Sequence, residues 1–288
     1  MFKILEKEEL APQTHMLRIK APEITKKAKP GQFVVFCIDE KAERIPITIA
    51  DIDKNEGSIT VLVQEVGAST LRIGMLKKGD SILSIVGPLG VPTHIEEKIG
   101  NVVCMGGGFG IAALHPIAKK LKELGNSVIS IIGARSKNLL LMEKEMKEAS
   151  TSLKISTDDG SYGQHGFVTD ILKNLIEEGI KIDRIYAIGP VPMMRAVCNM
   201  TKPLKIKTYI SLNPIMVDGT GMCGGCRVTV KGETKFACVD GPDFDGHEVD
   251  FDELVKRQAV YKKDEEISYK IAKEKHDSLC IKRDKNER

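Results

Sequence analysis

The stretch that most constrains this chain is residues 216–238, MVDGTGMCGGCRVTVKGETKFAC, which holds three of the seven cysteines. Cys223 and Cys226 are separated by two glycines, and Cys238 follows twelve residues later. Glycine adopts positive φ without strain and has no side chain to block the backbone, so such a loop can fold around a compact object. The pattern therefore predicts that several thiolates converge on one inorganic centre.

Asp218 stands five residues before Cys223, where a plant-type ferredoxin would have its first cysteine. In the spacing C-x4-C-x2-C with a distant fourth cysteine, the later positions fall on Cys223, Cys226 and Cys238. We therefore predict a [2Fe–2S] cluster held by Asp218, Cys223, Cys226 and Cys238. Two alternatives stay open: a zinc ribbon, which normally uses two C-x2-C pairs, and reduced cysteines in a tight loop.

The composition restricts the compartment and the class of partner. The 43 basic and 40 acidic residues are spread along the 288-residue chain, which argues against a dedicated nucleic-acid surface. The first ten residues lack the apolar core of a secretory signal, and the longest apolar stretch, 102–114, is too short to cross a bilayer. Seven cysteines with metal-like spacing favour a reducing compartment. The sequence thus predicts a cytoplasmic protein with no nucleic-acid or membrane partner.

Residues 1–98 predict an antiparallel six-stranded barrel. Short alternating or apolar runs recur at close spacing and are separated by Pro-Gly, Asn-Glu-Gly and Lys-Gly-Asp turn signals. Regular short strands with such breaks are typical of small barrels. The expected strands are 2–6, 15–19, 33–38, 45–50, 58–64 and 81–85.

Two segments of this barrel indicate a bound cofactor. Residues 44–51, RIPITIAD, place Arg44 and Thr48 on one short apolar strand. Residues 66–70, VGAST, would open a helix over 71–76, and a helix N-terminus offers free N–H groups to an anion. Together the two segments could hold a pyrophosphate beside a flat ring. An ordinary barrel strand and a Ser/Thr helix cap remain the alternative.

Residues 99–210 predict a parallel α/β domain that binds a nucleotide. An apolar strand at 101–105 runs into a glycine turn at 106–110, and a helical pattern over 111–124 and a strand at 127–132 follow. The turn would bring the backbone close to a dinucleotide phosphate. It is not G-x-G-x-x-G, because Ile111 takes the third glycine position, and tight packing alone remains an alternative explanation.

Further loops follow the other expected strands of this sheet. Ligands of open α/β sheets bind beyond the carboxyl ends of the strands, so these loops should gather at one edge. The expected strands at 154–156 and 185–188 end there as well. The candidates that these loops supply are Arg135, Asp159, Gly189, Pro190 and Met193.

In this order, the barrel, the strand with Thr48, the Gly-Ala-Ser-Thr loop and the Gly-Gly-Gly-Phe-Gly turn resemble the ferredoxin–NADP reductase superfamily. Its strand motif is Arg-x-Tyr-Ser, which here puts Thr48 in the serine position near flavin N5, Ile47 in the aromatic position, and Arg44 one residue early. The resemblance implies FAD bound by Arg44, Pro46, Ile47, Thr48, Gln64, Gly67, Ala68, Ser69 and Thr70. It implies NAD(H) bound by Gly107, Gly108, Phe109, Gly110, Arg135, Asp159, Gly189, Pro190 and Met193. NADP stays open as an alternative to NAD, because Arg135 could attract a 2′-phosphate.

With the cluster stretch added, roughly residues 1–260 are similar to the electron-transfer subunits of dihydroorotate dehydrogenase. Because Asp218 replaces the first cysteine, they resemble still more the small subunit of NADH-dependent reduced ferredoxin:NADP oxidoreductase. That resemblance implies a heterodimer whose larger flavin and iron–sulfur subunit binds NADP(H) and ferredoxin, with electron bifurcation in the complex. A dihydroorotate-type subunit and a non-catalytic redox-sensing or scaffolding module remain alternatives.

No catalytic residue is predicted, because the cofactors carry the chemistry of hydride transfer. His115, after the glycine turn, is interpreted as a packed or capped residue. The predicted regions are a barrel at 1–98, a nucleotide domain at 99–210, a cluster lobe at 211–250 and a helical, charged tail at 251–288. Asp250 is expected to cap the first tail helix, and beyond Tyr261 the sequence fits either a solvated helix or an arm on a partner subunit.

Overall fold

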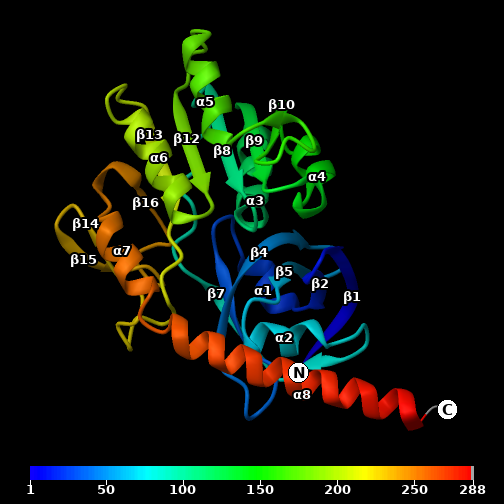
Figure 1. The fold of residues 1–288 in the computed structure, drawn as a ribbon. Coiled ribbons are helices and arrows are strands. Elements are labelled where there is room, and N and C mark those ends of the chain that lie inside the picture. Colours follow the sequence, from blue (N-terminus) through cyan, green and yellow to red (C-terminus); the bar gives the residue numbers. More distant parts are fainter. Residues whose placement is uncertain (287–288) are drawn as a thin grey trace.

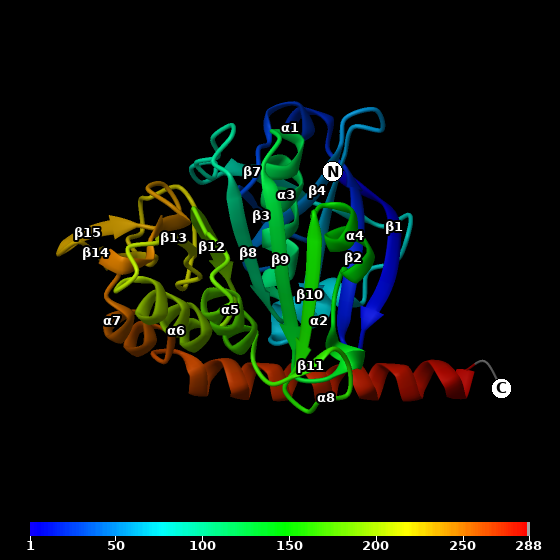
Figure 2. The same cartoon turned by 90° about the horizontal axis from the view of Figure 1, so that it is seen from above.

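The computed structural model describes the backbone of residues 1–286 and the side chains of residues 1–276, so the side chain of Cys280 lies outside it. An antiparallel barrel, a parallel sheet flanked by helices and a small C-terminal unit follow one another along the chain (Figures 1 and 2). The long last helix crosses beneath the barrel. This is the fold class that the sequence predicts.

The N-terminal barrel consists of seven strand segments. Their bounds are β1 (Phe2–Ala11), β2 (Thr14–Lys20), β3 (Phe33–Cys37), β4 (Ile45–Asp53), β5 (Ser58–Gln64), β6 (Ser81–Ile82) and β7 (Ser84–Leu89). The order is β6-β1-β2-β5-β4-β3-β7. Only Leu83 separates β6 from β7, and these pair with β1 and β3 respectively, so one broken strand reaches both edges. The barrel is therefore nearly closed, with the six expected strands and the sixth interrupted.

Alternate barrel residues fill its interior. Leu17 and Ile19 of β2 and Val61 of β5 are fully buried, as the period of two along a strand requires. Two short helices, α1 (Pro22–Lys27) and α2 (Ala68–Gly74), pack against the barrel core with Ile24 and Ile73. α2 begins three residues earlier than expected, so Ala68, Ser69 and Thr70 belong to the helix itself.

A seven-stranded sheet forms the second region. Its strands are β8 (Asn101–Gly107), β9 (Ser127–Ala134), β10 (Ser152–Thr157), β11 (Gln164–His165), β12 (Arg184–Ile188), β13 (Lys207–Ser211) and β16 (Asp243–Asp245). The order is β11-β10-β9-β8-β12-β13-β16. All neighbours pair in parallel except β13 and β16, which are antiparallel. The turn signals after Cys238 gave no hint that β16 would return to this sheet.

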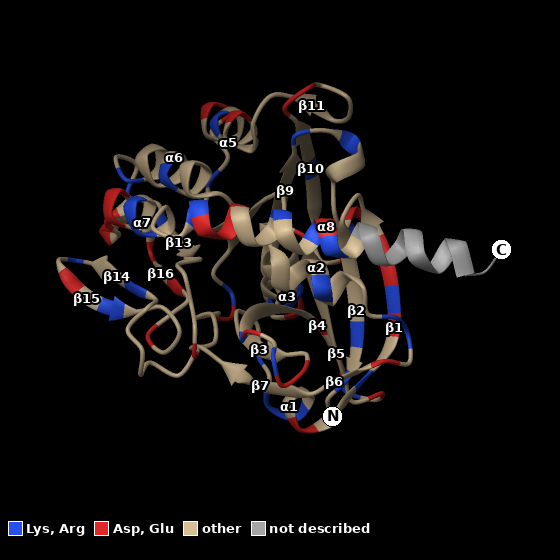
Figure 3. Ribbon diagram, turned by 60° about the horizontal axis from the view of Figure 1, so that its bottom comes forward, with Lys and Arg blue, Asp and Glu red and all other residues tan. Residues whose placement is uncertain are grey.

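Helices cover both faces of this sheet, which explains its apolar strands. Val102 and Cys104 pack with α3 on one face, whereas Val103 and Met105 pack with α5 and α6 on the other. β8 and β9 contain no charged residue, whereas Figure 3 shows charged residues along β1 and α7. The helices are α3 (Gly110–Glu123), η1 (Lys137–Leu139), α4 (Glu143–Glu148), α5 (Val168–Glu177) and α6 (Val191–Thr201).

The C-terminal unit contains a hairpin and three helices. They are β14 (Arg227–Val230), β15 (Glu233–Phe236), η2 (Gly246–Glu248), α7 (Phe251–Gln258) and α8 (Lys262–Asn286). Asp250 caps α7 by accepting a hydrogen bond from the Glu253 N–H at 2.9 Å, which confirms the expected cap. α8 packs against α2 (Figure 1). The last two predicted tail residues, 287 and 288, lie outside the described residues. Among the helices described, none has the length and apolar character to cross a bilayer.

Candidate functional site

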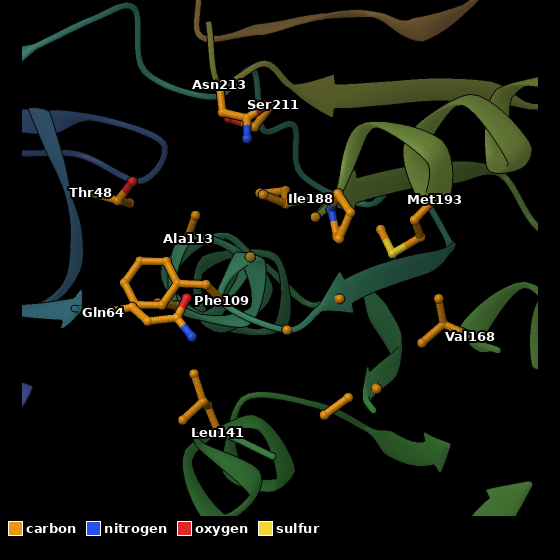
Figure 4. A pocket seen from close by; sticks show the side chains of 18 of the residues that line it. Thr48, Gln64, Phe109, Ala113, Leu141, Val168, Ile188, Met193, Ser211 and Asn213 are labelled. Carbon is orange, nitrogen blue, oxygen red and sulfur yellow. The ribbon is translucent and has the colours of Figure 1, made fainter. Parts of the chain in front are cut away.

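A cavity of about 950 Å³ lies where the three regions meet (Figure 4). The barrel lines it with β4 and the end of β5, and the sheet with the loops after β8, β9, β10 and β12. The segment after β13 completes the wall. The carboxyl ends of the parallel strands thus face the barrel, as expected for a ligand site of an open α/β sheet.

The barrel wall contains four of the predicted flavin-binding residues. Pro46, Ile47 and Thr48 lie next to one another on β4, and Gln64 ends β5. Thr48 stands opposite Phe33 of β3, which also lines the cavity. The side chains of Thr48 and Gln64 reach the cavity from the barrel side in Figure 4.

The glycine turn forms the floor of the sheet side. Gly107, Gly108, Phe109 and Gly110 all line the cavity, and Phe109 leads into α3 without a side-chain cap. The Ile111 and Ala112 N–H groups donate to the Gly108 and Phe109 carbonyl oxygens at 3.3 and 3.2 Å, so an anionic ligand would approach this fourteen-residue helix at the turn itself, at Phe109 and Gly110. Gly108 has φ +53°, and a Cβ on Gly110 would overlap the backbone carbonyl of Ile188. The glycines of this turn are therefore needed both for its close packing on β12 and for the approach of a ligand to its backbone.

The other nucleotide-site candidates divide into two groups. Gly189, Pro190, Met193 and Arg135 line the cavity. Asp159 does not belong to the lining, since its Oδ1 accepts the Ser161 N–H at 2.9 Å. The Ser161 hydrogen bonds lower the pKa of Asp159. The neighbouring Asp158 lines the cavity in its place.

The predicted pyrophosphate loop lies outside the cavity lining. Thr70 Oγ1 accepts the N–H groups of Val66 and Gly67, each at 3.0 Å, and so caps α2 from within. The Ser69 hydroxyl donates to the Glu43 carboxylate. Residues with a flavin role assigned by resemblance but absent from the lining are Arg44, Gly67, Ala68, Ser69 and Thr70.

Several cavity residues were missed by the sequence reasoning. Ser211, Asn213 and Met216 line the wall after β13, a strand that was not anticipated. Recognising a further parallel strand would have placed Ser211 at its carboxyl end. Phe167, which is 62% exposed at the start of α5, also lines the cavity. His115, as expected, is buried, and its Nδ1 lies 2.9 Å from the Ala50 carbonyl oxygen of β4.

The cysteine stretch brings two sulfurs together in the C-terminal unit. Cys226 and Cys238 are each 2% exposed, and their Sγ atoms lie 3.2 Å apart. Burial, and after it the neighbouring Cys226 thiol, raises the pKa of Cys238 to about 12. Two buried thiols in contact are poised to share a metal, since binding replaces their protons.

Asp218 and Cys223 form the second half of this loop. The Asp218 carboxylate accepts the Thr220 N–H at 2.8 Å and the Cys223 N–H at 2.9 Å, and these bonds hold its pKa below the ordinary value. Cys223 is exposed, and its Sγ accepts the Gly225 N–H at 3.4 Å. Gly221 and its neighbour Gly219 have φ of +86° and +74°, which explains the glycines of the loop.

The donor set has the number of ligands that a two-iron centre needs. Among the residues described, no three His, Cys, Asp or Glu side chains surround one ion position. A [2Fe–2S] cluster takes four protein ligands for two irons, which matches two pairs, Cys226 with Cys238 and Asp218 with Cys223. Thiolates on one tetrahedral metal with bonds of about 2.3 Å lie about 3.8 Å apart, a small change from the observed separation.

The cluster loop packs directly behind the cavity wall. A Cβ on Gly219 would lie 3.6 Å from the Phe33 ring and 2.9 Å from Val35 Cγ2, both on β3 of the barrel. Phe33 lines the cavity, and so does Met216, two residues before Asp218. The predicted ligands therefore adjoin the predicted flavin end of the cavity.

Comparison with known proteins identifies similar chains. Residues 213–250 match the family described as the iron–sulfur cluster binding domain of dihydroorotate dehydrogenase B. A Thermotoga maritima protein, named a homolog of the electron transfer subunit of dihydroorotate dehydrogenase B (NAD(+)), is 50% identical over 92% of this chain and 93% of its own length. A chain in a solved structure of an NADH-dependent reduced ferredoxin–NADP oxidoreductase, studied for flavin-based electron bifurcation, is 47% identical with a TM-score of 0.89, covering 94% of this chain and 97% of that one. Ferredoxin–NADP+ reductase from Plasmodium falciparum, 17% identical with a TM-score of 0.60 over 74% and 95% of the two chains, shares the fold.

Proposed function

Because this chain belongs to the family of dihydroorotate dehydrogenase B electron-transfer subunits and their homologues, we propose that it moves electrons between NAD(H), an FAD and a [2Fe–2S] cluster. As a member of this family, the chain is an electron-transfer subunit of the oxidoreductase type. It has an iron–sulfur binding domain and the flavin- and nucleotide-binding fold of ferredoxin reductases. An electron-transfer subunit works with a partnering catalytic subunit.

The observation that carries the proposal is the continuity of the site. One cavity is lined by Thr48 of the barrel, the glycine turn of the sheet and Met216, and the cluster loop packs on Phe33 behind it. A nicotinamide and a flavin can therefore meet in the cavity, with the iron–sulfur ligands adjacent. No side chain is needed as an acid or base for hydride transfer.

The chain's own residues bind and orient. The glycine turn at the start of α3 would receive the dinucleotide phosphates, with Arg135 and Met193 beside them. Pro46, Ile47 and Thr48 would form the edge against which the flavin ring lies. When bound, FAD accepts electrons as a hydride and yields them singly to an iron–sulfur centre. Asp218, Cys223, Cys226 and Cys238 would hold that centre.

The fuller proposal is a heterodimer that couples NADH, NADP(H) and ferredoxin. Its support is the 47% identical relative, whose chain is covered almost end to end and whose structure is that of a reduced ferredoxin–NADP oxidoreductase. One flavin and one cluster cannot divide an electron pair between two acceptors of different potential. The larger partner would thus supply a second flavin and the NADP(H) and ferredoxin sites.

A second candidate is the electron-transfer subunit of a dihydroorotate dehydrogenase, which the family match over residues 213–250 favours. The two candidates predict different partners. Copurification with a large flavin and iron–sulfur protein would support the first, whereas copurification with a dihydroorotate-oxidising protein would support the second. Binding of both cofactors without reduction of the flavin by NADH would leave a redox-sensing or scaffolding module.

Electron paramagnetic resonance of anaerobically purified, reduced protein tests the cluster. We expect a [2Fe–2S] signal in the wild type that changes shape in Asp218→Cys, because a thiolate donates more charge to iron than a carboxylate. An unchanged signal would remove Asp218 from the ligand set. No signal in iron-replete protein, together with a flavin that NADH does not reduce, would overturn the electron-transfer proposal.

A further inference from the structure

A carboxyl group that the electron path does not use lies behind the cavity wall. Asp243 of β16 stands directly opposite Ser211 of β13 in their antiparallel ladder. The Thr93 hydroxyl, from the segment joining barrel and sheet, donates a hydrogen bond to its Oδ2. Its Oδ1 is buried and has no hydrogen-bond partner among the residues whose side chains are described. One side chain thus joins all three regions and keeps one oxygen unsatisfied.

One layer of residues separates this carboxyl from the cavity. Ser211 and Pro242, its ladder partner and its chain neighbour, both line the cavity. Gly31 lines it as well, and a Cβ there would collide with the Thr93 hydroxyl. A Cβ on Gly90 would lie 3.0 Å from Phe33 Cε1 and 3.1 Å from Pro242 Cδ, and Phe33 stands opposite Thr48, the predicted neighbour of the flavin. The group therefore lies behind the proposed flavin end rather than the nucleotide end.

The surroundings of Asp243 raise its pKa toward neutral pH. Burial raises the pKa of Asp243 to about 6, and the Thr93 and Ser211 hydroxyls oppose the shift. Among the described residues no charged side chain contributes, neither Asp245 on the same strand, nor Lys207 on β13, nor His94 beside Thr93. A carboxyl without a charged partner responds strongly to a charge that arrives nearby.

The proposed function changes the charge of the cavity in every cycle. NADH loses a hydride, which is two electrons and one proton, and leaves as NAD+. One negative charge then remains in the cavity until the two electrons depart singly toward the cluster. The proton that is part of the transferred hydride must also leave the cavity.

We propose that Asp243 stores the proton that balances this charge. By way of Ser211 and the cavity, its carboxyl takes up one proton after NAD+ leaves and releases it when the electrons depart. The cycle takes in NADH and one proton, and it yields NAD+, two electrons and two protons. The proposal rests on the proposed function, because it needs a flavin in this cavity.

The test is the pH dependence of the two-electron midpoint potential of the bound flavin, read from its visible absorbance in the full chain. Each proton taken up with two electrons shifts the potential by about 30 mV per pH unit. Above the pKa of Asp243, we expect the wild-type slope to exceed that of Asp243→Asn by the equivalent of one proton.

Two further variants separate proton storage from structural damage. Asp245→Asn removes the same charge from the same strand and should keep the wild-type slope. Thr93→Val removes the hydroxyl that lowers the pKa of Asp243, so it should move the steep interval to higher pH. This second shift tests the proposal even where Asp243→Asn does not fold.

Two results would overturn the proposal in distinguishable ways. Equal slopes in wild type and Asp243→Asn, or a steep interval that Thr93→Val leaves in place, would remove the proton store, while reduction of the flavin by NADH would leave the proposed function standing. A wild-type chain that binds no flavin would show no visible absorbance, and the proposed function would fall with it.

Discussion

The cavity and the cluster loop are neighbouring sites built in opposite ways. The cavity walls are strand ends and a helix N-terminus, fixed by the packing of buried residues such as Met105 and Ile188. The cluster loop has glycines at positive φ, an exposed Cys223 and a carboxylate bonded to loop N–H groups. The difference indicates that the cavity forms with the fold, whereas the loop would take its final shape from a bound metal.

The largest effect should follow from changing a buried cysteine. Cys226→Ser places a hydroxyl in a site that is 2% exposed and removes a predicted ligand. We expect loss of the cluster signal and a decrease of several kcal/mol in the unfolding free energy of the iron-loaded chain. Iron content, paramagnetic resonance and chemical denaturation measure this. Cys198→Ser, buried but distant from the loop, is the matched control and should retain iron. An unchanged iron content in Cys226→Ser would contradict this contrast between the cavity and the cluster loop.

A backbone clash should damage the cavity without touching the cluster. A Cβ on Gly110 would overlap the Ile188 carbonyl, so Gly110→Ala should cost about 1–3 kcal/mol of unfolding free energy and abolish detectable NADH binding. Gly125→Ala at the other end of α3 is the control, because a Cβ there meets no atom within 4 Å and only its φ of +77° is unfavourable. It should cost about 1 kcal/mol and leave NADH binding intact. Calorimetry and denaturation distinguish the two, and undisturbed NADH binding in Gly110→Ala would contradict the assignment of the turn.

We expect the free energy of unfolding to depend on pH through Asp243, which lies between the two sites. Burial raises the pKa of Asp243 from 3.8 to about 6, so the folded chain holds this proton more tightly than the unfolded chain. Its contribution to stability is therefore complete below about pH 4 and is lost as pH rises to about 6, with a total of up to about 3 kcal/mol. Asp243→Asn should remove this dependence from denaturation curves recorded at pH 4 to 7. If wild type and Asp243→Asn showed the same pH dependence, the Asp243 carboxyl would be hydrated rather than buried.

The smallest effect concerns the loop whose flavin role rests on resemblance. Thr70→Val removes the acceptor of the Val66 and Gly67 N–H groups, and it should lower the unfolding free energy by about 1 kcal/mol. We also expect FAD to bind several-fold more weakly, because the helix end would lose its order. Ser69→Ala is the stability control, because the Ser69 hydroxyl donates to the exposed Glu43. Unchanged FAD affinity in Thr70→Val would reduce this loop to a helix cap.

Local patterns predicted much of this molecule. The period of two in the barrel strands, the apolar runs of β8 and β9 and the cap at Asp250 are set by neighbours a few residues apart, and the structure reproduces them. The predicted cavity residues of the α/β domain line one edge because the ends of parallel strands share it. Asp158 lines it instead of Asp159 because a turn hydrogen bond to Ser161 decides which carboxylate points inward.

The sequence by itself thus determined the fold class, the glycine turn and the spacing of the cluster residues, because each depends on chain-local geometry. Only the tertiary structure decided that Phe33, Ser211 and Met216 complete the cavity, and that Asp243 lies behind it. These residues come from distant parts of the chain. Their meeting depends on how the barrel, the sheet and the returning strand β16 bury one another's surfaces, which no local pattern encodes.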